Sequence, residues 1–219
     1  MAERPNCPLC TTRKPKRSCP GISAEICPQC CGREREQTIR CPLDCAYLVE
    51  GRKHDRPPQD QVIDFPNKDI RVDEEFIEQN NELFTVVSLS VIKTAQQTPG
   101  IVDNDVRECL AAVIKTYLTR DSGIIYDSKP ENTLAAAMQT RLMDSIEEFK
   151  TVAFEKTGIH SVKDPDVTKM LAFLQRLEMT VNNGRLYGRA FLSSMQSAFA
   201  VHVADNLAPK AEGQSSLII

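Results

Sequence analysis

The spacing of cysteines near the N-terminus constrains this chain more than any other feature. Eight of the nine cysteines in the 219-residue sequence lie within the first 45 residues. They form two Cys-x-x-Cys pairs and one Cys-x-x-x-Cys pair, and the other two lie between these pairs. Two thiolates from such a tight turn can reach one tetrahedral ion, so eight cysteines predict two zinc sites. The candidate ligands are Cys7, Cys10, Cys19, Cys27, Cys30, Cys31, Cys41 and Cys45.

Disulfides and iron–sulfur clusters are the alternatives to zinc. The first residues lack an apolar core of signal-peptide length, and no apolar run is long enough to span a bilayer. We therefore expect a cytoplasmic protein whose thiols stay reduced, and the spacings match neither ferredoxin pattern. Large apolar residues are few before Gly51, so metal must supply much of the folding energy. A structural zinc contributes on the order of 10–16 kcal/mol in small peptides.

The adjacent pair Cys30 and Cys31 predicts how the ligands divide between the two ions. Neighbouring side chains of an extended backbone point to opposite sides, so these two thiols are expected to serve different ions. The predicted sets are Cys7, Cys10, Cys27 and Cys30 for one zinc and Cys19, Cys31, Cys41 and Cys45 for the other. His54 is a further candidate ligand, although a solvated histidine between two charged neighbours is the simpler interpretation.

Two longer patterns surround these cysteines. One runs Cys27-Pro-Gln-Cys30-Cys31-Gly32 with Arg35 three residues later, and the other runs Cys41-Pro-Leu-Asp-Cys45-Ala-Tyr47-Leu48. This stretch resembles the N-terminal cysteine-rich module of a group of uncharacterised bacterial proteins. The resemblance covers under a fifth of the chain. It implies a bacterial, cytoplasmic, metal-binding protein and nothing about substrate.

Charge is unevenly distributed along the chain, whose formal net charge is -3. Residues 1–57 hold eleven Lys or Arg and seven Asp or Glu, whereas the remainder holds sixteen and twenty-three. Eight thiolates and two zinc ions would add a net charge of about -4 and bring the N-terminal part close to neutrality. This weakens, but leaves open, nucleic-acid binding through Arg13, Lys14, Lys16 and Arg17.

The rest of the chain predicts an all-α domain. The paired prolines at 57–58 indicate a linker over residues 52–72 after the module of residues 1–51. Apolar residues at three-four spacing then predict five helices, over residues 73–97, 104–121, 134–158, 164–181 and 185–206, in a bundle spanning 73–207. Asp103 and Asp164 are the expected N-caps of two of them. We expect a disordered tail over residues 208–219.

Catalytic motifs are absent from the sequence. There is no glycine-rich phosphate loop, nucleophile elbow or His-Glu-x-x-His helix. A four-cysteine zinc site has no open position for a reacting water, and Cys109 lies on an apolar helix face as a core residue. We therefore expect a protein that is not an enzyme, in which zinc serves structure and protein–protein interaction or self-association. Nucleic-acid binding and a thiol redox switch at Cys30–Cys31 are the alternatives.

Overall fold

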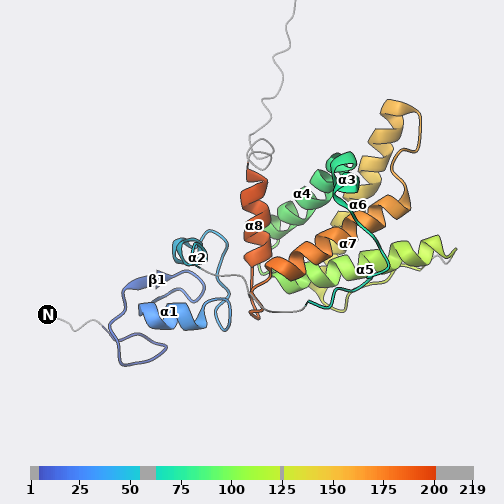
Figure 1. The fold of residues 1–219 in the computed structure, drawn as a ribbon. Coiled ribbons are helices and arrows are strands. Elements are labelled where there is room, and N and C mark those ends of the chain that lie inside the picture. The colour runs from blue at the N-terminus through green and yellow to red at the C-terminus, as the bar shows by residue number, and fades with distance from the viewer. Residues whose placement is uncertain (1–4, 55–62, 124–125, 201–219) are drawn as a thin grey trace, which may run out of the picture.

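The structure, a computed structural model, describes residues 5–54, 63–123 and 126–200. It confirms a mainly helical fold in which a small cysteine module, defined by residues 5–54, precedes a helical domain (Figure 1). Within these residues the chain forms a single two-stranded sheet, which belongs to the cysteine module. Among the helices of the described residues, none combines the length and apolar character needed to cross a membrane.

The cysteine module is a β-hairpin followed by two short helices. Strands β1 (Arg17–Cys19) and β2 (Ala24–Ile26) pair antiparallel, and helices α1 (Pro28–Glu34) and α2 (Ala46–Arg52) follow. Pro28 starts α1 because a proline has no N–H to leave unpaired in the first turn. The module buries few large apolar side chains, chiefly Ile26, Ile39 and Leu48, and they pack among the cysteines.

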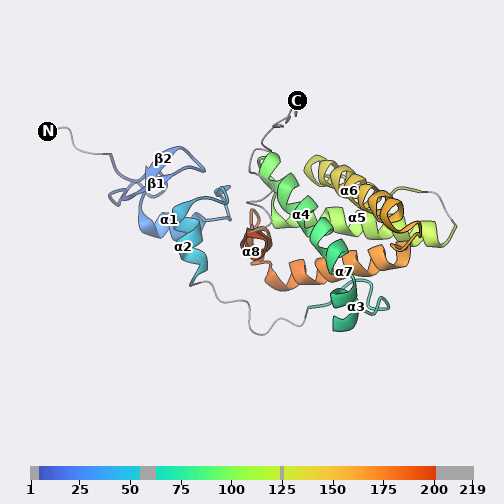
Figure 2. The same cartoon turned by 90° about the horizontal axis from the view of Figure 1, so that it is seen from above.

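The helical domain contains six helices in the described residues. They are α3 (Glu74–Gln79), α4 (Asn81–Gln97), α5 (Asp103–Asp121), α6 (Thr133–Thr157), α7 (Asp164–Val181) and α8 (Ala190–Ala198). Helix α5 packs against α6 and α7, and α4 packs against α6 (Figure 2). Their apolar faces form one continuous core that includes fully buried Leu110, Tyr117 and Leu142.

Two expected helices differ from the structure. The helix expected over 73–97 is divided into α3 and α4 at Asn80, whose side-chain amide donates to the carbonyl of Phe76 at 2.9 Å. Asparagine side chains compete with the helical backbone in this way. The helix expected from residue 185 begins only at Ala190, and its predicted end lies outside the described residues. Leu186, expected to face the core, is 64 % exposed.

Both predicted aspartate caps are wrong. The N-caps of α5 and α7 are Val102 and Lys163. The buried Asp103 carboxylate instead accepts the backbone N–H groups of Phe191 and Leu192, at 2.9 and 3.1 Å, and so caps α8 from another helix. Asp164 accepts a hydrogen bond from Lys150 at 2.6 Å. A tertiary partner has replaced the local one in each case.

The cysteine module joins the helical domain through Glu36. We call residues 182–189 the junction loop. The backbone carbonyl of Glu36 accepts the N–H of Tyr187 at 2.8 Å, and its carboxylate accepts the N–H of Arg189 at 2.8 Å and the amide of Asn183 at 2.9 Å. Arg52 of the module completes the set with an ion pair at 2.6 Å. This contact places the module beside α8 in both views (Figures 1 and 2).

The predicted tail over residues 208–219 lies outside the described residues. So does the middle of the predicted linker, of which residues 52–54 and 63–72 are described.

Candidate metal centre

Four cysteines converge on one point of the cysteine module. The sulfur atoms of Cys7, Cys10, Cys27 and Cys30, which we call the first cluster, all lie within 4.8 Å of one another. The sulfurs of Cys10 and Cys27 are 3.9 Å apart. Zinc–sulfur bonds of about 2.3 Å in a tetrahedron place two sulfurs about 3.8 Å apart. The first cluster can therefore hold one metal ion with four thiolate ligands.

Two different local structures supply these ligands. Cys7 and Cys10 lie in a tight turn closed by a hydrogen bond of 2.7 Å from the Thr11 N–H to the Cys7 carbonyl. Thr11 adopts the left-handed conformation that such a turn requires. Cys27 is the N-cap of α1, and its sulfur accepts the N–H of Cys30 at 3.4 Å. The positive end of a helix favours a thiolate at this position.

The first cluster already favours ionised sulfur at two positions. Hydrogen bonds from the Thr12 hydroxyl and then from the Thr12 and Arg13 N–H groups lower the pKa of Cys10 to about 5. Burial opposes ionisation of Cys7, yet backbone N–H groups outweigh it and lower the pKa of that thiol. Burial and neighbouring sulfurs raise the pKa of Cys30 to about 12. A divalent cation would reverse this last effect, because a coordinating thiol is deprotonated outright.

Arginines surround the first cluster. Contacts with the sulfurs of Cys27 and Cys10 raise the pKa of Arg13. Glu34 raises the pKa of Arg33, and the sulfurs of Cys30 and Cys10 add to the effect. Arg33 is already paired with Glu34 at 2.6 Å, so Arg13 is the one of the two that chiefly offsets the negative charge that thiolate ligands would bring. Thr12 was not among the predicted site residues, although a hydroxyl two residues after Cys10 can reach its sulfur.

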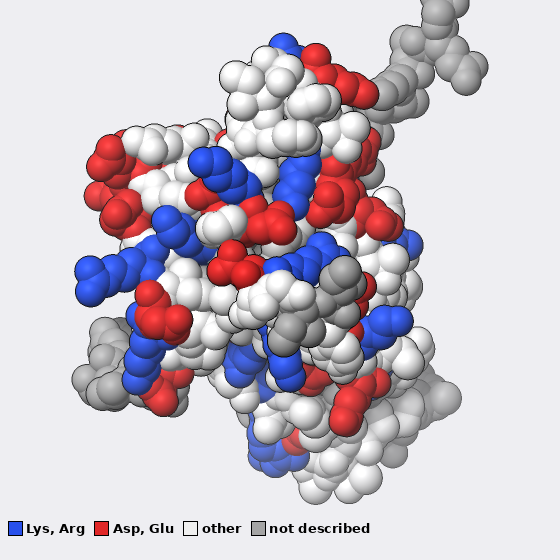
Figure 3. Space-filling view, turned by 90° about the vertical axis from the view of Figure 1, so that its right-hand side faces the viewer, with Lys and Arg blue, Asp and Glu red and all other residues white. Residues whose placement is uncertain are grey.

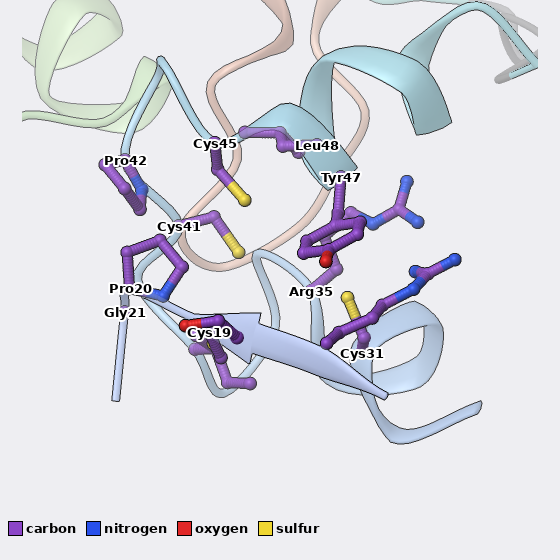
Figure 4. Close-up of a pocket in the computed structure, with 13 residues that line it drawn as sticks. Cys19, Pro20, Gly21, Cys31, Arg35, Cys41, Pro42, Cys45, Tyr47 and Leu48 are labelled. Atoms are coloured by element: carbon purple, nitrogen blue, oxygen red, sulfur yellow. The ribbon is translucent and has the colours of Figure 1, made fainter. Parts of the chain in front are cut away.

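The other four N-terminal cysteines line a separate, enclosed cavity. We call Cys19, Cys31, Cys41 and Cys45 the second cluster, and their cavity has a volume of about 10 Å³. The sulfurs of Cys31, Cys41 and Cys45 point into the same space (Figure 4). Burial raises the pKa of Cys41, and the nearby Cys45 and Cys19 sulfurs add to the effect. The sulfurs of the second cluster lie farther apart than those of the first. Among the described residues, only the first cluster has ligand atoms that all lie within 4.8 Å of one another.

The adjacent residues Cys30 and Cys31 face different clusters. Both lie in α1, where consecutive side chains are about 100° apart around the axis. The extended backbone predicted at Cys30 and Cys31 is therefore wrong, although the two thiols face different clusters as expected. His54 is 79 % exposed and lies 3.7 Å from the Glu50 carboxylate, away from both clusters. Cys109 is fully buried in the helical core, as predicted.

Comparison of the chain with models of protein families, with curated proteins and with solved structures yields no match. Its two cysteine clusters are therefore interpreted from their own geometry and chemistry.

Proposed function

We propose that the cysteine module binds zinc and that the protein is a zinc-stabilised interaction protein of the bacterial cytoplasm, not an enzyme. The observation that carries the proposal is the first cluster, whose four sulfurs lie within 4.8 Å of one another, with one pair at 3.9 Å, close to the spacing of a tetrahedral zinc site. Four thiolates leave no coordination position for water or substrate. A zinc ion there would supply folding energy, which the small apolar core of the module needs.

A second zinc ion at the second cluster is part of this proposal. Four thiols around one enclosed cavity support it. A cavity of about 10 Å³ corresponds to about one water-sized sphere, which suits a single ion and little else. Three of these sulfurs already point into that cavity (Figure 4). Binding would draw the four sulfurs inward from their present positions.

Metal analysis of protein purified without added metal tests both sites. We expect about two zinc ions per chain, and about one in Cys7→Ser/Cys10→Ser and in Cys19→Ser/Cys45→Ser. Cys109→Ser is the matched control and should retain both ions, because its thiol lies in the helical core. One ion in the wild type that survives Cys19→Ser/Cys45→Ser would eliminate the second site. Absence of zinc from the wild type would refute the whole proposal.

Exposed apolar side chains support an interaction role for the helical domain. Val152 and Phe154, near the end of α6, and Ile159 just beyond it are all exposed, Ile159 by 68 %. We propose that this end of α6 pairs with a second copy or with another protein. Sedimentation velocity over a range of concentrations tests self-association. Phe154→Ser/Ile159→Ser should remove any dimer, while Leu186→Ser, which changes an exposed leucine elsewhere, should leave it intact.

Nucleic-acid binding is the second candidate, because Arg13, Lys14 and Lys16 are exposed. Two observations weigh against nucleic-acid binding. Arg13 contacts thiols of the first cluster, and Arg17 stacks over the Tyr47 ring at 4.8 Å. Figure 3 shows the side of the helical domain that lies opposite the cysteine module, and there Lys and Arg are interspersed with Asp and Glu, so this side of the helical domain offers no uniformly basic surface. A salt-dependent affinity for DNA or RNA that weakens in Lys14→Ala/Lys16→Ala would support this candidate over the interaction role.

A further inference from the structure

A cleft opens where the cysteine module meets the helical domain. Its volume is about 530 Å³, and its walls come from Arg40 of the module and from three parts of the helical domain, residues 100–107, 132–134 and 182–187. Small-molecule sites have volumes of roughly 300–1,000 Å³ and are common at domain interfaces. The size and position of this junction cleft are therefore those of a ligand site, which the proposed zinc sites do not explain.

Two arginines in the junction cleft are fixed without being neutralised. The Arg40 guanidinium stacks over the Tyr187 ring at 4.7 Å, and Arg185 donates to the carbonyl of Arg35 at 2.6 Å. Neither forms an ion pair with any carboxylate in the described ranges. Fixed guanidinium groups lose little side-chain entropy when an anion binds, so this arrangement favours anion recognition.

The other charged residues of the junction cleft are already paired within the protein. Arg107 donates two hydrogen bonds to the Glu178 carboxylate, at 2.8 and 3.2 Å. The buried Asp105 accepts the N–H of Val102 at 2.8 Å and the amide of Asn132 at 2.5 Å. The Asp105 donors are neutral, but this carboxyl is only 3 % exposed, so Arg40 and Arg185 remain as the charges accessible to a ligand.

Helix α6 adds to the positive potential in the junction cleft. This 25-residue helix begins at Thr133, which lines the cleft. The N-terminus of a long helix carries a partial positive charge and favours anions, above all phosphate. The helix end only supplements the two arginines, because Asn132 already caps the N–H groups of Leu134 and Ala135.

We propose that the junction cleft binds a small phosphate-bearing molecule, with Arg40 and Arg185 as its principal contacts. A guanidinium group can donate two parallel hydrogen bonds to two oxygens of a phosphate, and two guanidinium groups balance the double negative charge of that phosphate. Arg40 belongs to the cysteine module and Arg185 to the helical domain. A phosphate held by both therefore ties the two domains together. The proposal goes beyond the zinc sites and is independent of them.

Calorimetric titration of the full-length, metal-loaded protein with inorganic phosphate tests the proposal, with succinate as a carboxylate of equal charge. We expect saturable phosphate binding that is tighter than succinate binding. Arg40→Gln should weaken phosphate binding at least about tenfold, because it removes one charge-assisted contact with the phosphate. Arg40 is exposed, so its replacement removes the contact with the Tyr187 ring but opens no buried space at the junction. Arg185→Lys keeps the charge but loses the planar fork and should weaken binding less.

Arg120→Gln is the matched control, because Arg120 pairs with Asp127 away from the junction cleft. Its affinity for phosphate should equal that of the wild type. The proposal is overturned if phosphate binding does not saturate, if Arg40→Gln binds as tightly as Arg120→Gln, or if succinate binds as tightly as phosphate. Zinc content is measured after each titration, so that loss of metal is not mistaken for loss of binding.

Discussion

Replacing Glu36 by glutamine tests how strongly the cysteine module is held to the helical domain. The Glu36 and Arg52 side chains are only 1 % and 13 % exposed and form an ion pair at 2.6 Å. The same carboxylate accepts hydrogen bonds from Asn183 and Arg189. Glutamine has the same size but no charge, so it leaves Arg52 buried without its counter-ion. Removing one partner of a buried ion pair costs about 3–5 kcal/mol, and we expect the free energy of unfolding to fall by that amount.

Urea unfolding of the metal-loaded protein measures the loss, and hydrogen exchange locates it. The N–H groups of Tyr187 and Arg189 both donate to Glu36, so both should exchange faster in Glu36→Gln. Glu50→Gln is the matched control, because Glu50 belongs to the same module and its side chain is 63 % exposed. Its effect should stay within about 0.5 kcal/mol.

Adding Arg52→Met to Glu36→Gln separates the ion pair from the rest of the contact. The second change removes the stranded charge, so the double variant should recover part of the lost stability. A loss below about 1 kcal/mol in Glu36→Gln, with unchanged exchange at Tyr187 and Arg189, would show that this carboxylate does not hold the junction.

Three further predictions concern other parts of the chain. Burial raises the pKa of Asp103 from 3.8 to about 7, so the stability it contributes is complete below about pH 4 and is lost as the pH rises toward 7. The free energy of unfolding should change by about 4 kcal/mol at most across this pH range. Urea unfolding at several pH values measures this dependence, which should be weaker in Asp103→Asn. Gly21→Ala should destabilise the module by about 1–3 kcal/mol, because a Cβ there would lie 2.6 Å from the Ile39 side chain. Gly32→Ala is the control, because a Cβ at Gly32 would have no atom within 4 Å. Equal unfolding midpoints for Gly21→Ala and Gly32→Ala would contradict the steric argument. Cys109 should resist thiol reagents in the folded protein and react on unfolding, because burial raises its pKa; rapid labelling of the native protein would contradict this.

Local patterns predicted the fold class and the first cluster. Paired cysteines with two residues between them define their own turn or helix start, as Cys7–Cys10 and Cys27–Cys30 do. Apolar residues at helical spacing likewise predicted α5 and α6 to within a few residues. Gly158 ends α6 in the left-handed conformation, as its position after the apolar stripe indicates. These features depend on neighbours in sequence.

The junction depends on distant residues, so the sequence did not reveal it. Glu36 stands among charged residues of the cysteine module, and its partners in the helical domain follow about 150 positions later. Arg185 and Leu186 were assigned to a helix because apolar residues continue at roughly helical spacing. The backbone of the junction loop bonds to Glu36 instead. Asp103 has the ordinary appearance of a cap, yet the N–H groups that it satisfies belong to α8.

The position of Glu36 also affects the order of events during synthesis. Its partner Asn183 emerges from the ribosome 147 residues later, and the N–H of Arg189 follows it. At about 5–20 residues per second, the cysteine module waits roughly 7–30 s for the surface that buries this carboxylate. During that interval its sulfurs, already brought together by local turns, are open to metal and to oxidants while the junction side of the module faces water. A metal ion can therefore reach the first cluster before the helical domain covers the junction side of the module.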